Sequence, residues 1–208
     1  MKKKAMVMLL SFTMGCSLAA CGAEDKEMDT NQGQTAEMDK VDADMTDEPE
    51  SNDLQKFPAF EGKDLDGNAV NSEELFAGNA VTVVNFWFTS CGPCVGELSE
   101  LDALNKELAD KDGALIGINS FTLNGDQTAI SEAKEVLEKN GAAYQNVYAD
   151  TDGELGTFME GVFAYPTTYV VDRQSNIVGE PIVGAITSKA QADALNKLID
   201  QAIAADMK

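Results

Sequence analysis

The stretch Asn85-Phe86-Trp87-Phe88-Thr89-Ser90-Cys91-Gly92-Pro93-Cys94 decides how the rest of the chain is interpreted. It begins inside an apolar run, Val81 to Phe88, of the kind that forms a buried strand. Leucines at helical spacing follow the cysteines and predict one helix from Cys91 to about Asp110. A Cys-x-x-Cys where a strand passes into a helix favours redox chemistry. The helix N-terminus stabilises a thiolate, and a spacing of three places the sulfurs close enough to bridge.

The composition excludes several kinds of site and partner. The 208 residues include no histidine, which removes Ser-His-Asp catalysis, His-based cysteine proteases and zinc or haem sites that need imidazole. The net charge of −21 argues against binding to nucleic acid or to anionic lipid headgroups. Much of the acidity is local, because residues 24–53 carry 12 acidic side chains and two lysines. The length fits one folded domain with appendages.

Residues 1–20 have the pattern of an export signal. Lys2 to Lys4 precede an apolar run from Ala5 to Leu18, which at about 14 residues is too short to span a bilayer comfortably. The sequence Leu18-Ala19-Ala20-Cys21-Gly22 then resembles a bacterial lipobox. The resemblance implies a lipid on Cys21 and a position on the outer face of the cytoplasmic membrane. The alternative is an ordinary secretory signal, cut after Ala20, that leaves a free thiol.

The cysteine count isolates one pair of thiols. Cys16 lies inside the export signal and Cys21 would carry the lipid, so Cys91 and Cys94 are the exchangeable thiols that remain. Without a histidine or a further retained cysteine, we expect no metal site. Residues 21–55 are polar and acidic without apolar periodicity, so we expect a disordered tether. It would let the domain reach partners near the membrane, or act only as a solubilising spacer.

Residues 56–208 are predicted to form one α/β domain. Two short strands, Phe57–Phe60 and Asp66–Val70, are expected around a turn at Asp66-Gly67. Alternation of strands and helices, ending in a hairpin and a helix, predicts a mixed sheet with helices on both faces. The further strands are expected at Val81–Phe88, Ala114–Asn119, Gln145–Ala149, Thr167–Asp172 and Ile177–Val183, and the helices at Ser72–Phe76 with Ser72 as cap, Cys91–Asp110, Gln127–Asn140, Asp152–Met159 and Thr187–Met207.

Three motifs occur in order along this domain. Pro58-x-Phe60 is followed by Asp64 and Gly67, then by the stretch Val84 to Cys94, and finally by Tyr165-Pro166-Thr167-Thr168-Tyr169-Val170-Val171-Asp172. Together they resemble the thioredoxin fold and, more specifically, the TlpA/ResA-like membrane-anchored thiol-disulfide oxidoreductases. The likeness covers about residues 57–208. It implies a mixed central sheet, an N-terminal β-hairpin extension, and a helix and strand inserted between Ile118 and Asp150.

The resemblance and the local chemistry assign roles to the two cysteines and the dipeptide between them. Cys91 is expected to be the nucleophile, because the helix N-terminus and solvent access favour its thiolate. Cys94, one turn further into the helix, would resolve the mixed disulfide. Gly92 and Pro93 are the dipeptide of thioredoxin, which is a reductant, so the resemblance implies an electron donor.

Pro166 stands at the family's cis-proline position, which lies next to the cysteines. The backbone beside it could pair with a substrate strand, and an ordinary trans proline is the alternative. Tyr165 would then face the sulfurs. With Gly92 and Pro93, these residues are expected to form the surface that binds the substrate.

Glu97 follows Cys94 by three residues and therefore falls on or near the same helical face. In ResA-like members a glutamate at this spacing is linked to activity and to thiol ionisation, so Glu97 is expected to carry a proton to or from Cys94. The alternative is a solvated glutamate that stabilises the helix dipole. Asn85 stands where cytoplasmic thioredoxins have a buried aspartate, and an amide cannot relay protons. Ser90 replaces the family's usual tryptophan, which removes an apolar lid beside the sulfur.

The leading hypothesis is an extracytoplasmic reductase of protein disulfides that needs no cofactor beyond its own Cys91–Cys94 pair. Family resemblance implies a membrane thiol carrier as electron donor and a monomeric protein. It offers two substrates: the haem-binding Cys-x-x-Cys of apocytochromes c, or an oxidised methionine sulfoxide reductase or peroxidase. The alternatives are a disulfide-forming oxidase of the same fold and a non-catalytic tethered binding lipoprotein. Peroxiredoxin chemistry is not expected, because Val84 and Phe88 stand where its proline and Thr/Ser are required.

Overall fold

The computed structural model describes residues 54–208. The predicted export signal, the lipidation site Cys21 and the tether up to residue 53 lie outside the described residues. Gln55, which the sequence places at the end of the tether, accepts a hydrogen bond from the Ile177 N–H at 2.7 Å. Among the described helices, none is long and apolar enough to cross a membrane.

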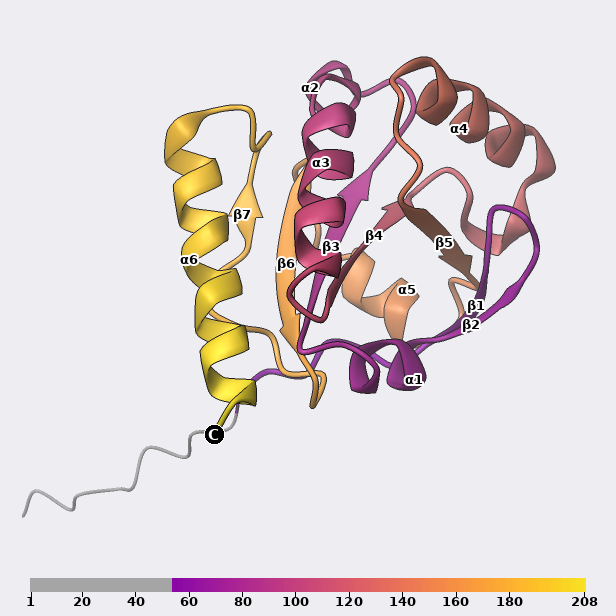
Figure 1. The fold of residues 1–208 in the computed structure, drawn as a ribbon. Helices are drawn as coiled ribbons and strands as arrows, with labels where there is room; N and C mark the ends of the chain where they lie inside the picture. The colour runs from indigo at the N-terminus through magenta and orange to yellow at the C-terminus, as the bar shows by residue number, and fades with distance from the viewer. Residues whose placement is uncertain (1–53) are drawn as a thin grey trace, which may run out of the picture. The chain divides into compact units, whose positions relative to one another are not determined.

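A mixed sheet of seven strands forms the centre of residues 54–208 (Figure 1). The strand order is β2-β1-β5-β4-β3-β6-β7. β3, β4 and β5 are mutually parallel along this order, whereas β6 runs antiparallel to β3 and β1 runs antiparallel to β5. The prediction of a mixed sheet is therefore confirmed. The strands are β1 (Glu61–Asp64), β2 (Ala69–Asn71), β3 (Val81–Trp87), β4 (Gly113–Asn119), β5 (Gln145–Ala149), β6 (Thr167–Asp172) and β7 (Ile182–Val183).

Helices cover both faces of the sheet, as the sequence predicts. One apolar cluster joins the sheet to α3, α4 and α6, and a second cluster joins its other face to α1 and α5. In Figure 1, α3 and α6 lie in front of the sheet and α5 lies behind it. The helices are α1 (Ser72–Ala77), α2 (Gly92–Gly96), α3 (Leu98–Ala109), α4 (Gln127–Lys139), α5 (Glu154–Met159) and α6 (Lys189–Asp206), with a short 3-10 turn at Leu123–Gly125.

β3 runs through the middle of the domain, and all seven of its residues are buried. Successive side chains of a strand point to opposite faces. Val83 and Trp87 accordingly belong to the cluster under α3, whereas Val84 and Phe86 belong to the cluster under α1 and α5. By the same alternation, Asn85 points toward the face that α2 and α3 cover. Trp87 and Phe86 are core residues, as expected.

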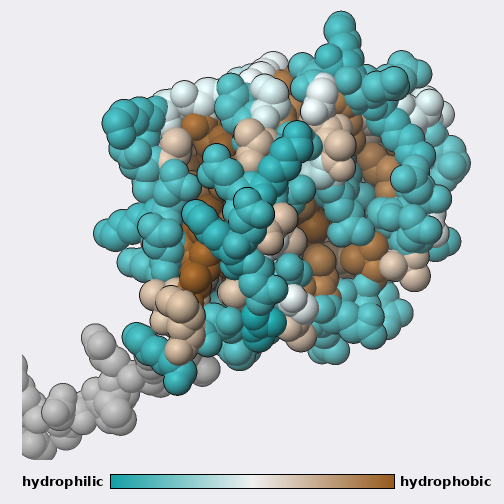
Figure 2. Space-filling model, in the orientation of Figure 1, coloured by the Kyte–Doolittle hydropathy of each residue, from teal (hydrophilic) through white to brown (hydrophobic). Residues whose placement is uncertain are grey.

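The surface outside these clusters is mainly hydrophilic on the face that Figure 2 shows, where apolar side chains are visible in seams between polar ones. Residues 54–208 carry a net charge of −14. A partner that approaches this domain therefore meets an acidic protein, which repels other acidic molecules.

The N-terminal hairpin is present, but its first strand is shifted from the prediction. Phe57–Phe60 is not a strand, and β1 begins only at Glu61. Pro58 has no N–H to donate, and Phe57 and Phe60 both turn into the same apolar cluster, which an alternating strand would not allow. The predicted cap of α1 is also wrong. Asn71 caps the helix through the Glu74 N–H, while the Ser72 hydroxyl accepts from the Phe60 N–H.

The segment after β6 also departs from the sequence prediction. The second strand of the final hairpin is not Ile177–Val183 but the two residues Ile182–Val183, with one isolated bridge between Val171 and Ile177. Gly179 adopts a positive φ of 68°, and Pro181 cannot donate a ladder hydrogen bond. These two residues interrupt the pairing that apolar composition alone suggests.

The helix expected from Cys91 to Asp110 is in fact two helices, α2 and α3. The break falls at Glu97, whose φ of −103° and ψ of −2° end one helix and begin the next. Gly96, directly before the break, weakens helical continuity. Because of the break, the Glu97 side chain points in a different direction from the one that an unbroken helix would give it.

Gly117 provides a test of how tightly the sheet packs beneath the cysteines. A Cβ on Gly117 would collide with Asn146 Oδ1, the atom that accepts the Trp87 Nε1–H at 2.7 Å. We expect Gly117→Ala to lower the free energy of unfolding by about 2 kcal/mol, because the β4–β5 region must shift and that hydrogen bond weakens. Urea denaturation of the full chain measures the change.

Gly96→Ala is the matched control, because a Cβ at Gly96 meets no atom within 4 Å. Its unfolding free energy should equal or exceed that of the unmodified chain, since alanine favours a helix more than glycine does. Equal losses in the two variants would contradict the packing explanation.

Candidate active site

Cys91 and Cys94 form a disulfide in the structure. Cys91 is the N-cap of α2, and its Sγ accepts the Cys94 N–H at 3.2 Å. Pro93 lies in the first turn, where its missing N–H leaves no helical hydrogen bond unmade. The Cys91 side chain is 7% exposed and that of Cys94 is fully buried. Of the two cysteines, Cys91 is therefore the more accessible to solvent.

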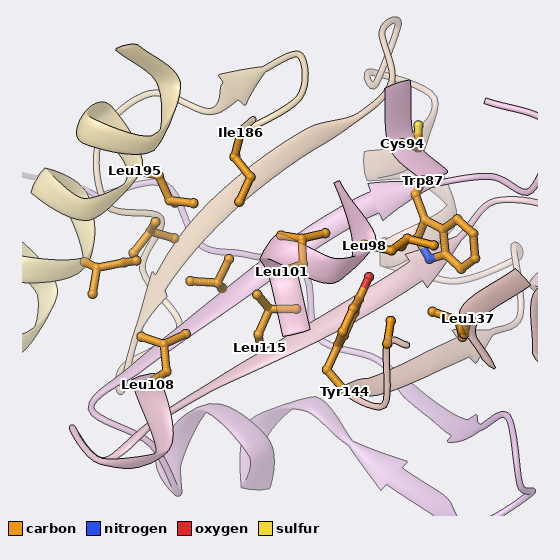
Figure 3. Packing of buried hydrophobic residues seen from close by; sticks show 14 of the residues in the cluster. Trp87, Cys94, Leu98, Leu101, Leu108, Leu115, Leu137, Tyr144, Ile186 and Leu195 are labelled. Carbon is orange, nitrogen blue, oxygen red and sulfur yellow. The ribbon is translucent and has the colours of Figure 1, made fainter. Parts of the chain in front are cut away.

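Cys94 is held in the apolar cluster on the α3 face of the sheet. Figure 3 shows its sulfur beside the Trp87 indole, with Leu98 next to the same ring. This environment lacks water and disfavours a charged sulfur. Ionisation of the Cys94 thiol would therefore depend on a nearby proton acceptor more than ionisation of the Cys91 thiol does.

The residues predicted to form the substrate surface lie in two segments. Gly92 and Pro93 are exposed, and Pro166 is buried with a cis bond to Tyr165. Tyr165 is half-buried and packs against the apolar cluster that contains both cysteines. The structure therefore brings Tyr165, more than 70 positions later in the chain, against the apolar cluster to which the disulfide belongs.

Glu97 is buried, so the interpretation as a solvated glutamate is wrong. Its side chain is inaccessible to solvent although it carries a carboxylate. Oε2 accepts the Ile186 backbone N–H at 2.7 Å, and Oε1 accepts Asn85 Nδ2 at 3.0 Å. Burial raises the pKa of Glu97 to about 7, although the hydrogen bonds from Ile186 and Asn85 act to lower it. Both protonation states of the carboxyl group are thus accessible near neutral pH.

Asn85 connects Glu97 to the neighbouring strand. Its Nδ2 also donates to Thr168 Oγ1 at 3.0 Å, because β3 and β6 pair with Asn85 opposite Thr168. Its Oδ1 is buried and has no hydrogen-bond partner among the described residues. The amide that replaces the aspartate of cytoplasmic thioredoxins therefore holds the carboxyl group of Glu97 and leaves an acceptor free beside it.

Two residues of the Glu97 site were not assigned a role from the sequence: Thr168, which accepts a hydrogen bond from Asn85, and Ile186, which donates to Glu97. Thr168 carries a signal in principle, since the strand periodicity of β3 and β6 places it on the same face as Asn85. Ile186 carries none, because it contributes only a backbone N–H from a loop 89 positions away. Among residues 54–208, no group of three or more His, Cys, Asp or Glu side chains is arranged to hold a metal ion.

Comparison with known proteins gives consistent matches. The model of the AhpC/TSA family matches residues 54–179. The thioredoxin-like protein YneN of Bacillus subtilis is 30% identical over 149 residues, which cover 68% of this chain and 78% of YneN. The thiol-disulfide oxidoreductase ResA of Bacillus anthracis is 28% identical over 144 residues, which cover 69% of this chain and 77% of ResA.

A solved structure shows the same architecture. The crystal structure of a thiol:disulfide interchange protein of the thioredoxin family from Chlorobium tepidum superposes with a TM-score of 0.55 and 26% sequence identity. The match covers 72% of this chain and 97% of that chain. The described domain therefore has a thioredoxin fold, to which the β1–β2 hairpin and the α4–β5 unit are added.

Proposed function

The chain belongs to the AhpC/TSA family of thioredoxin-like proteins and is a thiol-disulfide oxidoreductase, and we propose that it works as a reductase of protein disulfides. The observation that carries the proposal is the geometry of the Cys91–Cys94 pair. One sulfur is reachable, the other is buried, and a buried carboxyl group lies where α2 meets α3. This arrangement provides a nucleophile, a resolving thiol and a proton acceptor within one short stretch.

The reaction starts from the dithiol form. The Cys91 thiolate attacks one sulfur of the substrate disulfide, the substrate S–S bond breaks, and the other substrate sulfur leaves as a thiolate that takes up a proton. Cys94 then attacks Cys91 and releases the second substrate thiol. The substrate gains two electrons and two protons, and the protein is left with the disulfide that the structure contains.

Glu97 supplies the base for the second half of this reaction. Cys94 is buried and apolar in its surroundings, so its thiol must lose a proton before it can attack. With a pKa of about 7, the Glu97 carboxylate accepts a proton near neutral pH and returns it when the pair is reduced again. Asn85 and Ile186 position the carboxyl group through their hydrogen bonds.

The finer parts of the proposal rest on the family resemblance and on the N-terminal sequence. Lipid on Cys21 would anchor the domain outside the cytoplasmic membrane, and a membrane thiol carrier would supply electrons. The substrate would be the Cys-x-x-Cys of an apocytochrome c or the oxidised pair of a methionine sulfoxide reductase or peroxidase. The dipeptide Gly92-Pro93 supports the direction of reduction, since thioredoxin carries it.

The midpoint potential of the Cys91–Cys94 pair tests the direction. We expect about −270 mV, as in thioredoxin, when the full chain is equilibrated with dithiothreitol buffers and the thiols are alkylated and counted by mass. The Cys94→Ala variant cannot form the bond and should show no such transition, which separates the pair from Cys16 and Cys21. A potential above about −150 mV would instead assign the protein to disulfide formation.

A further inference from the structure

Aromatic side chains line the surface beside the active-site disulfide. The ring centroid of Phe88 lies 5.1 Å from that of Phe121 and 5.2 Å from that of Tyr165. The Phe88 carbonyl accepts the Cys91 N–H, so this row of rings begins one turn from the reactive sulfur. Phe163, two residues before Tyr165, is 92% exposed, and Phe121 is 49% exposed. We call the three contacting rings Phe88, Phe121 and Tyr165, together with the exposed Phe163 that precedes Tyr165 by two residues, the aromatic face.

The exposed side chains of the aromatic face contribute little to the stability of the fold. A phenylalanine that is 92% exposed buries almost no area in the domain. Large apolar side chains grouped on a surface mark a place where a partner binds. Ser90 is exposed beside Cys91 and offers no apolar contact of its own. The aromatic face supplies apolar side chains that Ser90 lacks.

The backbone next to the aromatic face is free to pair with an extended chain. Within the described part of the chain, the N–H groups of Phe163, Ala164 and Tyr165 donate no hydrogen bond. The carbonyl of Pro166, in contrast, is already occupied by the Gly184 N–H at 2.8 Å. Unpaired backbone donors beside apolar side chains fit a polypeptide strand, whose backbone pairs and whose side chains enter apolar contacts.

The charge of the protein around Ser90 limits which substrate strands can bind. Thr89 and Ser90 share a surface depression with Glu132, Glu135 and Lys139 of α4. Since the acidic side chains outnumber the lysine there and the described domain has a net charge of −14, acidic residues on a partner would be repelled.

We propose that the aromatic face binds an apolar side chain next to the substrate cysteine in an extended polypeptide. The protein then prefers disulfides flanked by apolar residues and discriminates against acidic neighbours. This inference rests on the proposed reductase function and names the substrate class of the same site. It assigns to Phe163 and Phe121 a role in specificity that is separate from the chemistry of the cysteines.

The test compares three synthetic peptides that share one intramolecular disulfide and differ in the residue beside the attacked cysteine: Leu, Ser or Asp. The full chain is reduced, desalted and mixed with each peptide, and the second-order rate constant is read from quenched samples. We expect the Leu peptide to react about tenfold faster than the Ser peptide, as roughly half-burying one side chain allows, and the Asp peptide to react slowest. Phe163→Ser should lose about fivefold on the Leu peptide alone.

Met207→Ser is the matched control, because Met207 is also exposed, at 76%, and follows α6 rather than lining the active site. It should leave all three rates unchanged, and Phe121→Ser should repeat the selective loss in a second position. Equal rates for the three peptides, or equal losses on the Leu peptide and on glutathione disulfide, would overturn the specificity role. If the unmodified protein reduces neither the peptides nor glutathione disulfide, the reductase function itself fails.

Discussion

Cys91→Ser should lower the rate of insulin reduction at least about a thousandfold, because serine cannot form the thiolate that opens a disulfide. Cys91 is the proposed point of attack, since it is 7% exposed while Cys94 is fully buried. The measurement is the dithiothreitol-driven precipitation of insulin, followed as turbidity with the full chain. Turnover that survives in Cys91→Ser would remove Cys91 from the mechanism.

Cys94→Ala provides the complementary result. It keeps the nucleophile but loses the resolving thiol, so the substrate should remain joined to Cys91 as a mixed disulfide that survives non-reducing electrophoresis. The Cys91→Ser/Cys94→Ala double variant controls for Cys16 and Cys21 and should capture nothing. Capture by the double variant would show that another thiol reacts, which contradicts the assignment of the pair.

Glu97→Gln should slow the resolving step about a hundredfold at pH 8, because the buried thiol of Cys94 loses its proton acceptor. In the unmodified protein the rate should rise with pH through about 7, the pKa of Glu97, since only the carboxylate accepts a proton. In the variant the inflection near pH 7 should be absent, because the remaining pH dependence follows the ionisation of the thiol alone. Stopped-flow measurement of peptide release from the mixed disulfide, from pH 5.5 to 8.5 (a range of about three units around that pKa), provides the profile.

Glu100→Gln is the matched control for the kinetic profile. Glu100 is exposed one turn away and acts on Glu97 only through its charge, which raises the pKa of Glu97. Its removal should move the inflection slightly to lower pH and leave the plateau rate unchanged. An unchanged pH profile in Glu97→Gln would exclude Glu97 as the base.

Glu97 should also leave a signature in the stability of the oxidised protein, where the cysteines do not titrate. Its pKa is about 7 in the folded chain and 4.5 when unperturbed. Between these two values the folded state retains a proton that the unfolded state has lost, so the free energy of unfolding falls as pH rises from 4.5 to 7. The expected loss is about 3 kcal/mol relative to Glu97→Gln, measured by urea denaturation.

Glutamine at position 97 is compatible with the folded site. Its carbonyl can accept the Ile186 N–H, and its amide can donate to Asn85 Oδ1, the acceptor that has no partner among the described residues. The variant should therefore fold and isolate the effect of charge. Parallel stability curves for the two proteins would mean that Glu97 titrates near its ordinary value.

Much of the domain could be predicted from local sequence. The apolar run that became β3, the turn of the first hairpin and the amphipathic periods of α4 and α6 depend on neighbours in the chain. The two strands that were predicted wrongly, Phe57–Phe60 and Ile177–Val183, also have a local cause. Pro58 and Pro181 lie in apolar segments that resemble strands, but a residue without an N–H cannot extend a ladder. Composition indicated burial correctly around Pro58, but around Pro181 only Ile177 is buried, and in both segments it indicated strand hydrogen bonding incorrectly.

The sequence by itself determined the Cys-x-x-Cys pair, its place between strand and helix, and Glu97 as the carboxyl group nearest to the pair along the chain, because these depend on spacings of three. Only the tertiary structure decided the burial, the hydrogen-bond partners and the pKa of Glu97. Its partners Asn85 and Ile186 lie 12 and 89 positions away, and they meet because β3 and the loop before α6 pack against the break between α2 and α3. That packing excludes water, and the exclusion of water raises the pKa of Glu97 to about 7, the range that the proposed role as a base requires.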